Sequence, residues 1–335
     1  MAKKVRARQH KKQHYVPRCY TKAWHDPLAE VGPHATPYVW VFDKDGSNPR
    51  RKAPGNLFTE TDIYTIERPG GERDLYLEHG LQQLEDQFTR VRELTFNRRV
   101  WPSADQFAWI FGFVAAAKVR TATHRDFHRG QWGGIRQRME EMREEVGRAS
   151  PEQKAAMARM GRLGAVGDVG ERMTIEDVRA IEEQPIQRTI GPMVAAAMAM
   201  FPRMSAMVLC ADDPIGFVTS DNPCTWHDPV AYRLQPIFRS PSLASQTIEV
   251  TMPISPELCL MITHDSRGQG FVEASREMVD ELNRRHVFHC EASFVSRSEE
   301  TRAIWFEPGV MPDDAWEARQ AMREAQAPQR ASPAS

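Results

Sequence analysis

The stretch from Ser103 to Thr121, SADQFAWIFGFVAAAKVRT, combines a helix start signal with the longest apolar run of the chain. Ser103 and Gln106 have the spacing of a capping box, so a helix is expected to begin here and to run towards His128. The apolar run from Phe107 to Ala117 is shorter than the ~18 residues that a membrane span needs. It therefore predicts a helix that is buried in a protein core, and no membrane partner is expected.

The composition is that of a globular protein. Of 335 residues, 41% are apolar and 27% are charged, which excludes a wholly disordered, collagen-like or coiled-coil chain. The 44 Lys and Arg residues against 45 Asp and Glu give a net charge of −1, so the chain as a whole is no general binder of polyanions. The five cysteines are dispersed and the N-terminus lacks an apolar signal segment, so a cytoplasmic protein with reduced thiols is expected.

Helical patterns occupy the middle of the chain, and strand-like patterns occupy its two ends. Apolar residues recur every three or four positions from Leu77 to Val91, which predicts a long helix, and glycines 133–134 are expected to end the helix that starts at Ser103. Further helices are expected at 135–147, from 151, from 174, and at 185–200, 276–285 and 313–325. Strands are expected at 38–42, 49–53, 62–66, 206–210, 215–219, 247–252, 258–263 and 287–295.

This arrangement predicts the α+β class, with a single large domain, a helical middle and an antiparallel or mixed sheet formed by the β-rich ends. Residues 1–22 carry eight Lys and Arg and no acid, so residues 1–12 are expected to form a mobile basic arm. Such an arm could contact the phosphates of a nucleic acid or nucleotide, or serve only for solubility. Residues 13–326 are expected to form the domain, and residues 327–335 a disordered tail.

The motif His14 to Arg18, HYVPR, lies next to the basic arm. Pro17 fixes its own φ and favours an extended Val16, which would hold His14 in one orientation. His14 could then act as a general base or metal ligand, because imidazole titrates near neutral pH. The spacing alone favours a structural role instead, in which the ring bonds a backbone carbonyl.

A second polar motif, Ser220 to Pro223 (SDNP), follows an expected strand. Asp221 and Asn222 carry oxygen atoms that could bind a divalent metal such as Mg²⁺ or orient a water molecule. These residue types also form an Asx turn without any ligand, and the spacing alone favours that interpretation.

Arg120 follows the apolar run at a position that should face the core. A buried guanidinium needs a carboxylate partner, and Glu85 or Asp221 is expected to supply it in a bidentate contact. The pair would be structural, or part of a catalytic site. His124 and His128 have the i,i+4 spacing of two metal ligands, but neighbouring Arg125 and Arg129 disfavour a cation, so a solvated, phosphate-facing or packing role is expected.

The motifs together resemble the DUF4238 family, whose members share an N-terminal His-Tyr-Val-Pro-Arg motif and a later Ser-Asp-Asn-Pro turn. Further elements of the family pattern are matched in order along the chain. They are Lys44–Gly46, Asp62–Tyr64, Leu81–Glu85, Arg120–Thr121, Pro253–Pro256, Asn283 and Ala292–Ser296. Cys19 departs from the pattern, where a bulky apolar or aromatic residue is usual. The resemblance implies that a set of distant polar residues belongs together, and it implies no particular reaction. This set is His14, Glu85, Arg120, Asp221 and Asn222.

Two functions are compatible with this set. In the first, the protein is an enzyme that hydrolyses a phosphodiester or phosphoryl bond in nucleic acid or a nucleotide. His14 would be the base or a metal ligand, and Glu85 and Asp221 would bind metal or water. Asn222 would be a positioning group, and Arg120 would hold a phosphate or an oxyanion. Tyr15, Arg18 and Ser220 would contact the substrate.

In the second, the protein is a non-catalytic binding or interaction protein, and the same residues form a buried structural network. A weaker, metal-free variant of the enzyme would use His14 and Asp221 as an acid–base pair.

Overall fold

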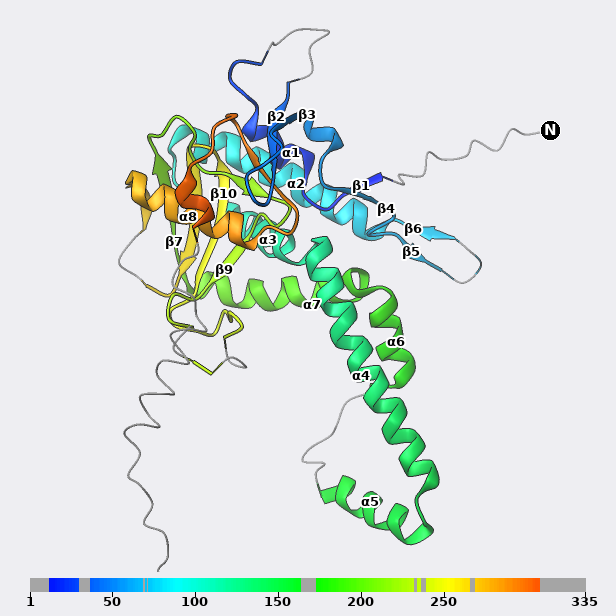
Figure 1. The fold of residues 1–335 in the computed structure, drawn as a ribbon. Coiled ribbons are helices and arrows are strands. Elements are labelled where there is room, and N and C mark those ends of the chain that lie inside the picture. The colour runs from blue at the N-terminus through cyan, green and yellow to red at the C-terminus, as the bar shows by residue number, and fades with distance from the viewer. Residues whose placement is uncertain are drawn as a thin grey trace, which may run out of the picture.

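The computed structural model describes residues 12–29, 37–68, 70, 72–163, 173–231, 234–235, 239–265 and 269–307 of the 335-residue chain. Within these residues the fold is of the α+β class, as the sequence predicts, with helices packed against two main sheets (Figure 1). The expected tail, the helix at 313–325 and residues 1–11 of the expected arm lie outside the described residues. Lys12 already belongs to the first strand.

The centre of the core is helix α3 (Ala104–Val119), which the apolar stretch forms. The predicted capping box is present, since Ser103 Oγ accepts the N–H of Gln106 and the Gln106 side chain accepts the N–H of Ser103. Nine of its residues between Ile110 and Val119 are buried, because neighbouring elements surround the helix. Helix α2 (Tyr76–Leu94) packs beside it, and the rings of Phe88 and Phe113 stack with centroids 3.7 Å apart.

Helix α3 ends earlier than the sequence suggested. Arg120 is its C-cap, and Thr121 caps a new helix, α4 (Ala122–Arg148), by accepting the N–H of His124. Helix α4 continues through Gly133 and Gly134, so the predicted break is wrong. A glycine inside a helix costs only about 1 kcal/mol, which the rest of a 27-residue helix outweighs.

Helices α4, α5 (Pro151–Leu163) and α6 (Ile175–Glu183) project from the body of the protein as a helical arm (Figure 1). Thr174 caps α6 in a second capping box with Asp177. Helix α7 (Pro185–Met200) returns to the body and packs on α3.

The larger sheet is mixed and comes entirely from the second half of the chain. Its strands in spatial order are β12 (Gly270–Ala274), β7 (Ser205–Ala211), β11 (Leu258–Thr263), β10 (Glu249–Ser255) and β9 (Thr225–His227). Only β12 and β7 run parallel. The edge strands β12 and β9 carry no strong strand pattern and were not expected.

The smaller sheet is antiparallel and joins the two ends of the chain, as the sequence predicts. Its order is β3 (Arg50–Lys52), β2 (Val39–Asp43), β13 (Ser293–Ser296) and β8 (Thr219–Ser220). The rings of Phe42 and Phe294 stack where β2 pairs with β13. The β-rich ends thus contribute to two main sheets rather than to one.

The remaining elements are short, apart from helix α8 (Arg276–His289). Strand β1 (Lys12–His14) pairs with β4 (Thr59–Thr61), and β5 (Ile66–Glu67) pairs with β6 (Arg73–Asp74). Helix α1 is Arg18–Thr21, and 3-10 turns occur at Lys22–Trp24, Pro54–Asn56, Phe96–Arg98, Phe201–Arg203 and Ala303–Phe306. In the described part of the chain, no helix is both long and apolar enough to cross a bilayer.

Three predicted strands are wrong in part. The segment 62–66 is mostly a turn, because Asp62 adopts a positive φ of 58°. The segment 215–219 is irregular up to Val218, since the Asp213 carboxylate takes the N–H groups of Ile215 and Gly216 that a strand would pair. The segment 287–295 is helical to His289, because α8 continues for about one turn beyond its expected end and buries His286 and Val287 there.

Gly216 offers a sharp test of this loop. It has a φ of +72°, and a Cβ atom there would lie 2.0 Å from the backbone oxygen of Pro256. We expect Gly216→Ala to lower the free energy of unfolding by about 3 kcal/mol or more, because both the strained φ and the overlap with rigid backbone must be relieved. The matched control is Gly134→Ala, at an open helical position, which should stabilise by up to about 1 kcal/mol. Equal effects of the two substitutions in urea melts would contradict this account of the loop.

Candidate functional site

Arg120 lies at the junction of α3 and α4 with its guanidinium buried. Its Nη1 donates to Glu85 Oε1 at 2.8 Å, its Nη2 donates to the backbone oxygen of His14 at 2.7 Å, and its Nε donates to the Tyr64 hydroxyl at 3.0 Å. The Arg120 side chain is 3% exposed and that of Glu85 20%. The predicted Glu85 contact is present, but it is a single hydrogen bond rather than a bidentate pair. The other donor groups serve the His14 backbone and Tyr64.

His14 is half-buried and its ring is anchored to the backbone. The Nε2–H group donates to the carbonyl oxygen of Gly55 at 3.3 Å, which is the structural contact that the motif spacing favoured. Burial lowers the pKa of His14, and the nearby Glu85 only partly opposes this shift. Strand β1 holds the residue in place, since His14 pairs with Thr59 and the N–H of Tyr15 donates to Phe58. The ring is therefore neutral at pH 7, with Nδ1 as its remaining acceptor.

The SDNP turn is engaged in a second, separate network. Asp221 Oδ1 accepts the N–H of Glu291 at 2.8 Å, and Oδ2 accepts those of Ala292 and Ser293 at 2.7 and 3.0 Å. Asn222 donates through Nδ2 to the backbone oxygen of His289 at 3.0 Å. Both side chains thus fix the turn that leads from α8 into β13. Burial raises the pKa of Asp221, while the three N–H donors favour its ionised form.

The residues expected to contact substrate flank these two networks. Ser220 is fully buried, and its Oγ bonds the backbone of Asn222 within the turn. Arg18 is exposed on α1, beside Gly55. Tyr15 is half-buried. Its burial raises its pKa, and the negative charge of Asp221 raises it further. Among the described residues, no hydrogen bond or ion pair joins His14 to Asp221 or Asn222.

Metal ligation has little support from this geometry. Both carboxylate oxygens of Asp221 already accept backbone donors, and Glu85 is paired with Arg120. Across the described ranges, no three His, Cys, Asp or Glu side chains gather as a metal site requires. His124 and His128 do lie together on α4, but His124 Nε2 faces the sulfur of Met193 at 3.2 Å, which is a packing contact.

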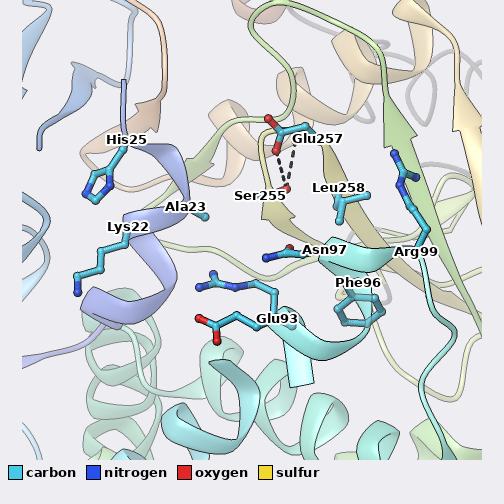
Figure 2. A pocket seen from close by; sticks show the side chains of 11 residues that line it. Lys22, Ala23, His25, Glu93, Phe96, Asn97, Arg99, Ser255, Glu257 and Leu258 are labelled. Atoms are coloured by element: carbon cyan, nitrogen blue, oxygen red, sulfur yellow. Dashed lines mark hydrogen bonds between the residues drawn. The ribbon is translucent and has the colours of Figure 1, made fainter. Parts of the chain in front are cut away.

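A partly polar recess of about 630 Å³ lies elsewhere, beside the C-terminal end of α2 (Figure 2). Three segments distant in sequence form it: the 3-10 turn at Lys22–Trp24, residues 92–99, and the β10–β11 turn at Ser255–Leu258. In Figure 2, Lys22 and His25 lie on one side of the space, and Glu93 and Asn97 on the other. Glu257 is held at the rim by Ser255 Oγ at 2.9 Å and by Arg297.

Arg92 gives this recess its chemical character. The residue is 8% exposed, and its Nη2 donates to the backbone oxygen of Cys19 at 3.1 Å. Among the described residues, its buried Nη1 has no hydrogen-bond partner and no carboxylate forms an ion pair with it. Burial lowers the pKa of Arg92. One feature of the sequence points to Arg92: it lies four positions after Phe88, on the face of α2 that is otherwise apolar.

Disrupting the hydrogen bonds of Arg120 should measurably lower the stability of the fold. Replacing Arg120 by Lys keeps the charge but removes the planar group that reaches three acceptors at once. We expect Arg120→Lys to lower the free energy of unfolding by about 2–3 kcal/mol, because the partly buried Glu85 carboxylate and the His14 backbone oxygen cannot both keep their donors.

A double-mutant cycle with Glu85→Gln isolates the pair within this network. The cycle should give a coupling energy of roughly 1 kcal/mol or more in urea melts. Additive effects would show that Arg120 and Glu85 do not interact in solution.

Acid should destabilise the fold through buried histidines. His286 is fully buried, and burial lowers its pKa from 6.5 to about 3. Between these values the unfolded chain binds a proton that the folded protein does not, so stability is lost as the pH falls from about 6.5 towards 3. At pH 5, this difference in proton binding at His286 lowers the free energy of unfolding by about 2 kcal/mol. Urea melts at pH 7 and pH 5 should show a smaller difference for His286→Gln than for wild type, and an unchanged difference would refute the assignment.

Comparison with known proteins gives one match. The model of a family described as a protein of unknown function, DUF4238, matches residues 12–301, which is most of the chain. No curated protein and no solved structure gives a significant match. The matched range includes both motifs, the Arg120 network and the recess around Arg92. The chain belongs to the DUF4238 family.

Proposed function

We propose that this protein binds a phosphorylated ligand, a nucleotide or a nucleic acid, in the recess beside Arg92. The observation that carries the proposal is a guanidinium that is nine-tenths buried, lines an open recess and lacks both a carboxylate and a partner for Nη1. A buried cation without a counter-ion is costly, so the negative charge of an anionic ligand in the recess would stabilise the Arg92 guanidinium.

The size and lining of the recess support a ligand of this class. A volume of about 630 Å³ is within the range of small-molecule sites, and Lys22 and His25 add donors at its edge. Arginine suits phosphate because its planar group can donate two parallel hydrogen bonds. Lys22, which lines the recess, is the last basic residue of the segment 1–22.

This proposal keeps the phosphorylated ligand expected from the sequence and assigns it to Arg92 rather than to Arg120. The donors of Arg120 that are described are already used by Glu85, His14 and Tyr64. The two motifs would then support the fold around a binding site, which corresponds to the non-catalytic alternative.

The decisive comparison is between two arginines of one helix. Arg92→Gln keeps a donor for the Cys19 carbonyl but removes the charge, and it should weaken binding of ATP, GTP or a fluorescent single-stranded oligonucleotide by roughly tenfold or more. The control is Arg90→Gln, on the exposed side of α2, which should leave affinity unchanged.

Titrations at two salt concentrations would distinguish a nucleotide ligand from a nucleic acid. The affinity for an oligonucleotide falls more steeply with salt, because the protein contacts several of its phosphates. Arg120→Lys should lower stability and leave the affinity intact. No binding of any of these probes by the wild type, or equal binding by Arg92→Gln, would refute the proposal.

A further inference from the structure

The helical arm exposes an apolar surface that the rest of the described protein does not cover. On α4, Ile135 is 40% exposed, Met142 63% and Val146 42%, and the helix has no fully buried residue. Spacings of seven and four place these three side chains within about 40° of one another around the helix axis. They form one stripe on the outer half of α4.

The stripe is distinct from the face of α4 that is already in use. Helix α6 covers the other side, where Arg136 pairs with Glu182, and Glu140 with Arg179. Next to the stripe, on the flank away from α6, lie Arg138 and Glu145. Both are exposed, and within the described residues neither has an ion-pair partner.

Helix α5 adds to the same uncovered region. Residues 151–160 are all exposed, including Met157 at 48% and Met160 at 71%. A helix of 13 residues without packing is marginal in water, so α5 needs cover to be stable. Only Ala149 and Ser150 separate it from α4, and the two helices meet at the outer end of the arm (Figure 1). Both helices carry exposed apolar residues.

We propose that the arm is a dimerisation element, in which α4 packs antiparallel against α4 of a second copy of this chain. The two-fold axis would pass between residues 141 and 142 of each copy. It would place Met142 of one copy next to Met142 of the other, and Ile135 of one copy at the level of Arg148 of the other. The same axis sets Arg138 of one copy opposite Glu145 of the other, because the two residues are equidistant from it and lie on the same flank. Two reciprocal ion pairs then border one apolar seam.

This charge arrangement is what selects a second copy as the occupant. A two-fold interface must be self-complementary, and a single pair of opposite charges at matched distances from the axis satisfies that condition. Charged residues that flank an apolar helical seam set partner and orientation in coiled coils. Helix α5 would begin beside α4 of the other copy near Ile135, where its exposed methionines gain a neighbour.

Charge reversal tests the geometry without threatening the fold, since both residues are exposed. Sedimentation velocity over a range of concentrations should show a wild-type dimer. Arg138→Glu alone and Glu145→Arg alone should each weaken it by roughly tenfold or more, because every attractive pair becomes repulsive.

Mixing the two single variants should restore a mixed dimer, since each copy then faces an opposite charge. The double variant on one chain should restore the symmetric dimer, and Met142→Glu should abolish it. A monomeric wild type would overturn the proposal. A dimer unaffected by the single reversals would also overturn it, because association would then occur through another surface.

Discussion

The structure depends on one buried charge, the guanidinium of Arg120, and on the three segments that satisfy it. A cation at the end of an apolar helix is costly unless each of its donors finds an acceptor. Glu85 supplies one from α2, Tyr64 supplies one from the loop after β4, and the backbone of His14 supplies one from β1. These contacts span 106 positions of sequence, so they fix how the N-terminal segment lies on the helical core.

The same network reaches the recess through α2 and Cys19. Glu85 and Arg92 are seven residues apart, two turns of one helix, and so project from the same side. Cys19 lies against both: its thiol approaches Glu85 Oε2 at 3.9 Å, and its carbonyl accepts Arg92 Nη2. Cys19 therefore places the recess next to the Arg120 network. The two make separate contacts, because Arg120 bonds Glu85 whereas Arg92 bonds the Cys19 carbonyl.

The sequence was most informative where structure is determined locally or by an energetic necessity. The Ser103–Gln106 capping box and the apolar face of α2 depend on neighbouring residues, and a buried Arg120 requires an acid. Where the sequence-based predictions of helices and strands were wrong, tertiary contacts determine the observed structure. Glu182 of α6 packs against Gly133, and Asp213 takes the N–H groups of the expected strand at 215. The recess combines residues near 22, 92 and 257, and no local pattern brings such segments together.

The SDNP turn illustrates why polar motifs need not be catalytic. Both carboxylate oxygens of Asp221 accept hydrogen bonds from backbone N–H groups at the junction of α8 and β13. Just before the turn, the Asn283 side chain accepts the N–H of Val218 and donates to the backbone oxygen of Gly216. The loop from 213 to 222 lacks strand partners along most of its length, so several of its buried N–H and C=O groups are bonded by side chains. Apolar side chains cannot accept these hydrogen bonds, whereas the short polar side chains of Asp, Asn, Ser and Thr can. The need to satisfy a buried irregular backbone therefore gives the polar residues of this motif a structural role without any ligand.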